Sequence, residues 1–313
     1  MSVGDDTRNP LSMEGGSIPN WDAPAFRMSD VAEAKIPFLI AAPHGGRDYS
    51  TDIWQKMRNP HSTSLSLEDR LVDQIAKAVS IRTGAAALIA QAPRALIDLN
   101  RDPDDIDWQM VTDGSPERRV SNAANRRART GLGLIPRRLL RAGEIWKTPL
   151  SRKELEERIR RVHSPYHHTL DRMLQSLRDR FGLAFLLDLH SMPPLAPAKR
   201  RNRQVEFVVG DRFGASAPDS ISSGAIDFFD RRGRVAERNS PYAGGYILDR
   251  HARPMGQIFG LQLEICRSTY LDHTLTSATP RIGAVANLIA QLVTYLNAQI
   301  SHDLRPDLRD AAE

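Results

Sequence analysis

Residues 183–193, Leu-Ala-Phe-Leu-Leu-Asp-Leu-His-Ser-Met-Pro, constrain the fold more than any other stretch of the chain. The unbroken apolar run at its start is typical of a strand buried on both faces in the parallel sheet of an α/β protein. The stretch ends in Asp188, His190 and Ser191, followed by prolines that cannot continue a strand ladder. Polar side chains therefore stand where open α/β sheets place ligand sites. Taken alone, His190 is better explained as a structural histidine at a strand end.

Other segments alternate between strand-like and helix-like patterns. Strands are expected at residues 36–42, 85–91, 95–99, 204–209 and 258–265, and helices at 66–81, 151–181, 219–231 and 280–300. The helix at 66–81 would begin with Ser66 as its cap, and Pro165 would kink or divide the helix at 151–181. This alternation predicts an α/β fold, a mainly parallel sheet with helices on both faces.

Composition excludes several classes of protein. Of 43 basic residues only six are lysines, and the net charge is +5. The basic runs at 126–129, 137–141 and 199–203 lack the interleaved aromatic residues that base stacking requires, so we expect solvated faces and no nucleic-acid partner. The single cysteine, Cys266, excludes a disulfide within the chain. We see no signal peptide and no apolar run near the ~18 residues of a membrane helix, and we expect a cytoplasmic protein with no membrane partner. The oligomeric state stays open.

Four predicted strand ends carry side chains that could take part in catalysis or ligand binding. They hold His44 in Pro-His-Gly-Gly, Asn100 and Arg101 in Asp-Leu-Asn-Arg, His190, and Glu264. Two histidines with one carboxylate can form a catalytic zinc site with an open position for water. A second glutamate beside such a metal can serve as general base. Asn100 and Arg101 suit recognition of a substrate carboxylate.

The motifs P-H-G-G, D-L-N-R, D-L-H-S-M-P, P-Y-A-G-G-Y-I and Q-L-E-I-C-R-S-T-Y, in this order between about residues 36 and 300, resemble those of the N-formylglutamate amidohydrolase family. That family is related to zinc carboxypeptidases and aspartoacylases. The resemblance implies a zinc-carboxypeptidase-like three-layer α/β sandwich with a mixed, mostly parallel central sheet. It also implies hydrolysis of the N-formyl group of an acyl amino acid, which yields formate and glutamate in histidine degradation.

The resemblance also implies roles for single residues. His44 and His190 correspond to the metal histidines and Glu264 to the general base. Asn100 and Arg101 correspond to the substrate-carboxylate pair of aspartoacylases, which share the D-L-N-R motif.

The third metal ligand is less clear from the motifs. Carboxypeptidases place an acid three residues after the first histidine, but Arg47 stands at that position here. Asp48, Glu68 and Asp69 compete. We choose Asp69 because the family places an acid at the start of the helix expected at 66–81, although for any one of these acids a turn or capping role is an alternative.

Three further residues are expected to line the substrate site. Arg250 would bind a second substrate carboxylate, with a solvated surface arginine as the alternative. Tyr242 would form a wall of the site or serve only in packing. Arg94, which precedes the D-L-N-R motif, would reach into the site.

The sequence therefore predicts a zinc amidohydrolase acting on a small acidic N-acyl amino acid. Residues 35–300 would form a single catalytic domain with a lid-like insertion at 103–150, where no periodicity is evident. Residues 1–34 would form a mobile polar tail that packs loosely in part, and residues 301–313 a C-terminal tail. The alternatives are a zinc amidase or peptidase for another N-acyl amino acid, and a non-catalytic member that binds an acidic ligand or nucleic acid through its arginines.

Overall fold

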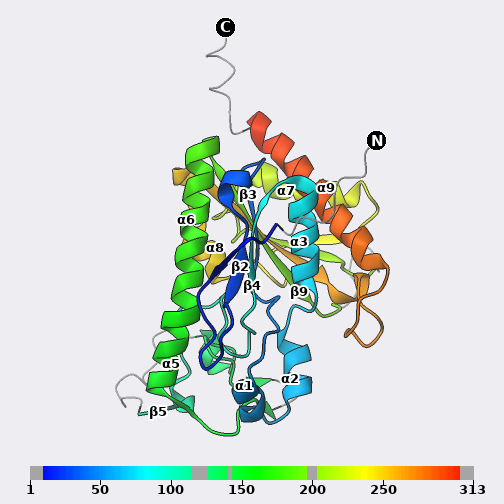
Figure 1. The fold of residues 1–313 in the computed structure, drawn as a ribbon. Helices are drawn as coiled ribbons and strands as arrows, with labels where there is room; N and C mark the ends of the chain where they lie inside the picture. The colour runs from blue at the N-terminus through cyan, green and yellow to red at the C-terminus, as the bar shows by residue number, and fades with distance from the viewer. Residues whose placement is uncertain (1–9, 114–125, 140–142, 196–202, 304–313) are drawn as a thin grey trace.

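The structure, a computed structural model, describes residues 10–113, 126–139, 143–195 and 203–303. Its main sheet has the strand order β1-β2-β4-β3-β9-β12-β10-β11 (Figure 1). Along that order the strands are β1 (Met13–Gly15), β2 (Phe26–Met28), β4 (Ala86–Ala90), β3 (Phe38–Ala42), β9 (Ala184–Met192), β12 (Ile258–Cys266), β10 (Phe207–Gly210) and β11 (Ala236–Arg238). The central strands β4, β3, β9 and β12 are parallel. β1 pairs antiparallel with β2, β2 with β4, and β10 with β12, whereas the edge strand β11 pairs parallel with β10. The mixed, mostly parallel sheet is thus confirmed.

Helices cover both faces of this sheet. α6 (Ser164–Phe181) and α8 (Tyr246–His251) pack on one face, and α3 (Val72–Thr83), α7 (Asp219–Asp230) and α9 (Arg281–Asp303) pack on the other (Figure 1). Leu186 of β9 lies in the core beneath α6, and its neighbour Leu187 lies in the core beneath α9. Because side chains alternate along a strand, Asp188 and His190 share the α6 face with Leu186. The three-layer α/β prediction is confirmed.

Two predicted elements differ from the structure. The helix expected at 66–81 is replaced by α2 (Pro60–Leu67) and α3, and Ser66 therefore caps no helix. Leu71 interrupts the helical path with a left-handed backbone (φ 62°), which no glycine announces in the sequence. The strand expected at 95–99 is absent; these residues form buried turns, and their apolar character reflects burial without ladder pairing.

Pro165 does not divide its helix. α5 (Arg152–Arg158), a π-helical turn (Ile159–His163) and α6 follow one another without a break. Pro165 lies in the first turn of α6, directly after the π-helical turn. A π-helical turn is wider than an α-helical turn, so the helix continues past Pro165 although proline has no backbone N–H to donate.

Part of the expected N-terminal tail is ordered. β1 and β2 lie within residues 10–34 and extend the sheet beyond β4. Phe26 and Ile18 are buried, and the ring of Phe26 meets Tyr166 of α6 edge to face. These residues thus pack on the domain as a sheet edge, for which a few apolar residues among polar ones suffice. Residues 1–9 and 304–313 lie outside the described residues.

The expected insertion at 103–150 consists of short elements. They are a 3-10 turn (Trp108–Met110), β5 (Val111–Thr112), α4 (Arg126–Arg129), β6 (Arg138–Leu139), β7 (Gly143–Glu144) and β8 (Leu150–Ser151). Leu134, Ile135 and Trp146 join the core beneath α6. Together with α1 (Thr51–Lys56) and α2, β5 occupies the lower part of the molecule in Figure 1, below the sheet. Residues 114–125 and 140–142, and 199–202 of the third basic run, lie outside the described residues.

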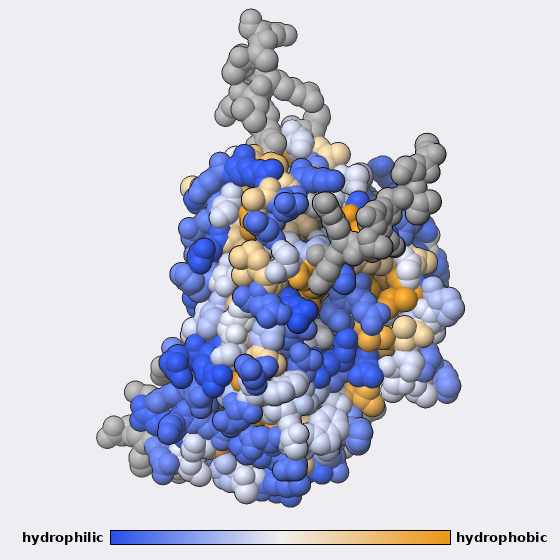
Figure 2. Space-filling view, viewed as in Figure 1, coloured by the Kyte–Doolittle hydropathy of each residue, from blue (hydrophilic) through white to orange (hydrophobic). Residues whose placement is uncertain are grey.

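The surface seen in Figure 2 is largely hydrophilic, with apolar side chains in small separate patches. Among the described residues, no helix combines the length and the apolar character that crossing a membrane requires.

Candidate metal centre and active site

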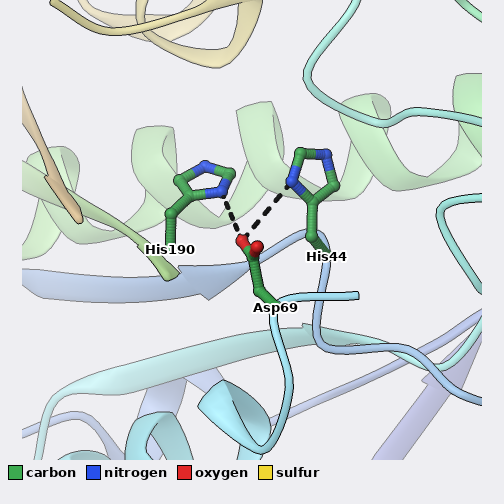
Figure 3. A group of neighbouring side chains, drawn as sticks. All are labelled: His44, Asp69 and His190. Atoms are coloured by element: carbon green, nitrogen blue, oxygen red, sulfur yellow. Dashed lines mark hydrogen bonds and ion pairs between the residues drawn. The ribbon is translucent and has the colours of Figure 1, made fainter. Parts of the chain in front are cut away.

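Two histidines and an aspartate meet beyond the central strands. His44 follows β3, His190 lies near the end of β9, and Asp69 lies in the connection between α2 and α3. All three side chains are buried. Figure 3 shows both imidazole rings directed at the Asp69 carboxylate. The structure thus brings together the three residues expected to hold a metal.

The atoms that face one another here have the character of metal ligands. His190 Nδ1 lies 2.8 Å and His44 Nδ1 3.5 Å from Asp69 Oδ2. One ligand atom from each residue lies within 4.8 Å of the others. His44 Nδ1 is buried and has no hydrogen-bond partner, which a native protein seldom leaves uncompensated. Two imidazole nitrogens and a carboxylate suit zinc. The residues therefore fit a metal ion.

A carboxylate holds the far nitrogen of each imidazole. His44 Nε2 donates to Asp98 Oδ1 at 2.7 Å, and His190 Nε2 donates to Asp188 Oδ2 at 3.0 Å. Hydrogens on the Nε2 atoms leave a lone pair on each Nδ1, directed toward Asp69. This carboxylate–histidine arrangement is the one that orients metal-binding histidines in proteins.

The electrostatics of the cluster favour a bound cation. Burial alone would raise the pKa of Asp69, but the neighbouring imidazoles of His190 and His44 hold it well below its usual range. Burial would likewise raise the pKa of Asp98, but Arg94 and His44 hold it well below normal. The pKa of His190 is raised because Asp188 and Asp69 outweigh the effect of burial. A cluster of buried carboxylates around two imidazoles thus attracts positive charge.

Arg267 fixes the orientation of Asp69. Its Nη2 lies 3.4 Å from Asp69 Oδ1 and donates to the Glu68 carbonyl, while its Nη1 donates to the Leu65 carbonyl at 3.2 Å. Its Nε donates to Ser191 Oγ at 3.1 Å. Asp69 therefore directs its other oxygen, Oδ2, at the two histidines.

The competing acids face elsewhere. Asp48 and Glu68 line a separate cavity of about 620 Å³, and Glu68 pairs with Arg70 at 2.8 Å. Asp69 does not begin a helix, as had been expected, but stands in the bend between two helices. The structure thus places Asp69, and neither Asp48 nor Glu68, beside the histidines.

Glu264 lies on β12 opposite His190 of β9. Its side chain is buried on the α6 side of the sheet, and its Oε1 accepts from Gln262 Nε2 at 3.0 Å. Burial raises the pKa of Glu264 to about 7. A carboxyl group that gains and loses a proton near neutrality, and that stands beside the candidate ligands without joining them, suits a general base.

Two arginines meet around Asp98. Arg94 Nε donates to Asp98 Oδ2 at 2.9 Å, and Arg101 Nε lies 3.9 Å from the same oxygen. Arg101 also donates to the carbonyls of Leu132 (3.0 Å) and Asn100 (2.8 Å), which ties the insertion to the site. Both guanidinium groups are mostly but not fully buried.

The remaining predicted residues occupy different surroundings. Asn100 is buried; its Oδ1 accepts from the backbone N–H of Ile247, and its Nδ2 lies 3.2 Å from His190 Nε2. Tyr242 is half-buried, and its pKa is raised by burial and then by the charge of Glu264, within whose electrostatic reach it lies. Arg250 is exposed on α8 and donates to the Tyr246 hydroxyl at 2.6 Å.

Sequence reasoning missed the roles of several residues at this site. Asp98, Asp188, Gln262 and Arg267 lie inside the quoted motifs but were given no role from the sequence. Their positions in the same short motifs as Asn100, His190 and Glu264 were the available signal.

Comparisons with known proteins show which sequences and structures this chain resembles. A family model described as N-formylglutamate amidohydrolase matches residues 36–271. N-formylglutamate deformylases from Pseudomonas putida and Pseudomonas aeruginosa are 27% and 26% identical over 245 and 246 residues, covering 77% and 76% of this chain and 84% and 83% of theirs. The crystal structure of an N-formylglutamate amidohydrolase from Ralstonia eutropha superposes with a TM-score of 0.77 at 28% identity, covering 88% of this chain and 98% of that one. A gene product of Agrobacterium tumefaciens, with a TM-score of 0.65 at 18% identity and coverage of 89% and 96%, shares the fold.

Proposed function

Because this chain belongs to the N-formylglutamate amidohydrolase family, we propose that it hydrolyses the N-formyl amide of N-formyl-L-glutamate or a similar acidic N-acyl amino acid. The products are formate and the free amino acid. We further propose that the reaction depends on zinc, and that residues 35–300 form the catalytic domain.

One observation carries the proposal. The imidazoles of His44 and His190 direct Nδ1 at Asp69, His44 Nδ1 lacks a partner, and Glu264 stands on the neighbouring strand. A buried set of this kind is expensive for a fold unless a cation completes it. The same set contains a carboxyl group suited to proton transfer, which a purely structural metal site does not need.

A zinc ion held by His44, Asp69 and His190 would supply a Lewis acid that polarises the formyl carbonyl and lowers the pKa of the attacking water toward about 7. Glu264 takes a proton from that water as the water oxygen adds to the formyl carbon. The same carboxyl group then gives the proton to the departing nitrogen as the C–N bond breaks. Its pKa of about 7 suits both the uptake and the release of the proton at neutral pH.

Arginines position the amino-acid part of the substrate. The Nε groups of Arg94 and Arg101 are anchored to Asp98 and the Leu132 carbonyl, so their forks are already oriented before a carboxylate arrives. We propose that these arginines, with Asn100 nearby, bind one carboxylate. Arg250 then binds the side-chain carboxylate, which makes an acidic amino acid the preferred substrate.

Two further parts of the chain complete the proposed substrate site. Tyr242, within electrostatic reach of Glu264, forms a wall beside the reacting amide. The insertion at 103–150, tied to Arg101 through the Leu132 carbonyl, covers the bound substrate as a lid.

The test is formate release by the purified protein and its Glu264→Gln variant. We expect the wild type to act on N-formyl-L-glutamate faster than on N-acetyl-L-glutamate or N-formyl-L-methionine. Glu264→Gln preserves shape and removes only the base, so kcat falls by about 10² or more, while metal content stays near wild type. The matched control is Glu237→Gln, the same change at an exposed glutamate of β11.

Four outcomes would contradict the proposal in different ways. Full activity of Glu264→Gln means that the base lies elsewhere. Loss of metal in this variant makes Glu264 a ligand. Faster hydrolysis of a non-acidic N-acyl amino acid overturns the substrate assignment. Binding of acidic N-acyl amino acids with no hydrolysis of any of them overturns the enzyme assignment.

A further inference from the structure

A chain of buried amides connects Glu264 to the start of α8. The backbone N–H of Ile247 donates to Asn100 Oδ1 at 2.9 Å, and Asn100 Nδ2 donates to Gln262 Oε1 at 3.3 Å. Gln262 Nε2 then donates to Glu264 Oε1 at 3.0 Å. The side chains of Asn100, Gln262 and Glu264 are all buried. None of these bonds is used by the mechanism described above.

Both ends of this chain fix its direction. A backbone N–H can only donate, so the Asn100 oxygen faces Ile247 and its NH₂ group faces Gln262. The Gln262 oxygen must then face Asn100, which directs its own NH₂ group at Glu264. The ionised Glu264, which is the form that acts as the base, can only accept, so the last link agrees with the first. The orientation of both amides therefore follows from the backbone of α8.

Glycines permit the close packing that this chain requires. A Cβ on Gly245 would lie 2.5 Å from Asn100 Oδ1, so a side chain there would displace the Asn100 amide. A Cβ on Gly260 of β12 would lie 2.9 Å from Leu248 Cδ2, so its absence lets α8 approach the strand that carries Gln262. The contacts thus belong to a tightly packed joint between α8 and β12.

We propose that Gln262 is a positioning residue for the general base and that Asn100 anchors it. Gln262 holds Glu264 Oε1, so the carboxylate presents its other oxygen, Oε2, for proton transfer. Asn100 fixes the amide of Gln262 and thereby acts on Glu264 from a distance. The inference rests on the proposed role of Glu264.

The first test is Gln262→Met, which keeps the length of the side chain and removes both the NH₂ donor and the oxygen acceptor of its amide. A lost hydrogen bond to a charged group predicts a fall in kcat of about 10- to 100-fold. KM and metal content should stay within about twofold of wild type, because neither the arginines nor the ligands are altered. The matched control is Leu263→Met, a buried substitution on the same strand that faces the opposite core, which should leave kcat within about twofold.

A second variant separates the two possible roles of Asn100. Asn100→Asp can still accept from Ile247 but presents an oxygen to Gln262 in place of a donor, so Gln262 must turn its amide. A fall in kcat with KM unchanged supports the amide chain. A rise in KM reports the substrate contact proposed for Asn100 above, whether or not Asn100 also anchors Gln262. An unchanged kcat overturns the anchoring role.

A double variant completes the test. In the Glu264→Gln background there is no base to position, so adding Gln262→Met should change the residual kcat by less than about twofold. If Gln262→Met lowers kcat by the same factor in both backgrounds, or if it leaves wild-type kcat intact while Glu264→Gln is inactive, Gln262 does not position the base. If Glu264→Gln alone is fully active, the proposed function itself fails at Glu264. The two failures are therefore distinguishable.

Thermal unfolding of each variant provides a readout independent of activity, and we expect similar midpoints for Gln262→Met and Leu263→Met.

Discussion

We expect mild acid to destabilise this protein through three buried histidines behind the D-L-N-R motif. His163 Nε2 donates to the Arg101 carbonyl at 2.9 Å, and His167 Nε2 donates to the Leu99 carbonyl at 3.0 Å. His251 Nε2 donates to His167 Nδ1 at 2.9 Å, since that nitrogen carries no hydrogen when Nε2 does. All three rings are at most 1% exposed. His163 and His167 thus hold the backbone on either side of Asn100, His251 supports His167, and all three rings do so as neutral groups.

The sign and size of the effect follow from the pKa shifts. Burial lowers the pKa of His163 to about 4, and burial with the charges of Arg250 and Arg253 lowers that of His251 to about 3. The unfolded chain binds these protons near pH 6.5, whereas the folded chain excludes them. The stability that these neutral histidines contribute is therefore fully present above about pH 6.5, and it is lost as the pH falls toward their pKa values in the folded chain. When the pH falls from 7 to 5, each of these two histidines should lower the free energy of unfolding by about 2 kcal/mol, together by about 4 kcal/mol. That is a large part of the ~5–15 kcal/mol of a typical domain.

The assay is urea unfolding at pH 7, 6 and 5 with a chelator present, since metal binding has its own pH dependence. The matched variant is His163→Gln with His251→Gln, because the glutamine Nε2 can donate as the histidine Nε2 does but does not titrate. We expect the variant to lose about 4 kcal/mol less than the wild type between pH 7 and pH 5. Because both proteins contain the same carboxylates, the comparison removes the contribution of carboxylates that titrate in the same pH range. Equal losses in both proteins would refute the reasoning.

Further predictions concern the candidate metal centre and the substrate arginine. The purified protein should hold about one zinc ion per chain, lose activity with a chelator, and lose both metal and activity in His190→Ala; full activity without metal would refute zinc dependence. Asp98→Asn removes the negative charge behind His44 Nε2–H and leaves only a neutral amide acceptor, so metal affinity should weaken about 10- to 100-fold, measured by competition with a chromogenic chelator. Arg101→Lys keeps the charge but loses the fork, so kcat/KM should fall about 10-fold or more with metal content intact; unchanged kcat and KM would remove Arg101 from the site.

The strands that carry the site could be predicted because their signal is local. β3, β9 and β12 are apolar runs that end in polar residues, and their cores and ends fall where the sequence places them. Gln262 and Glu264 share a face, as strand alternation requires, while Leu261 and Leu263 lie in the opposite core. The parallel pairing of β9 with β12 then brings Glu264 beside His190.

The bend that carries Asp69 could not be predicted in the same way. The spacing of Leu67, Leu71, Ile75 and Val79 suits one helix, yet Leu71 adopts a left-handed backbone and the chain bends before it. The bend is held by Arg267, which binds the carbonyls of this segment from about 200 positions away in the sequence. Tertiary contacts of this kind override helix propensity and leave no local trace.

The two carboxylates behind the histidines show where the boundary of sequence reasoning lies. Asp188 and His190 are two positions apart on one strand, so alternation alone places them on the same face, and their bond of 3.0 Å needs no other part of the fold. Asp98 reaches His44 across 54 positions, from a buried turn that resembles a strand in sequence. Strand geometry alone predicts the bond between Asp188 and His190. The bond between Asp98 and His44 can be predicted only if residues 95–99 are recognised as a turn and not as a strand. An Asp-x-His pair at the end of a buried strand therefore predicts one oriented imidazole by itself, and the search for a metal site can begin from that pair.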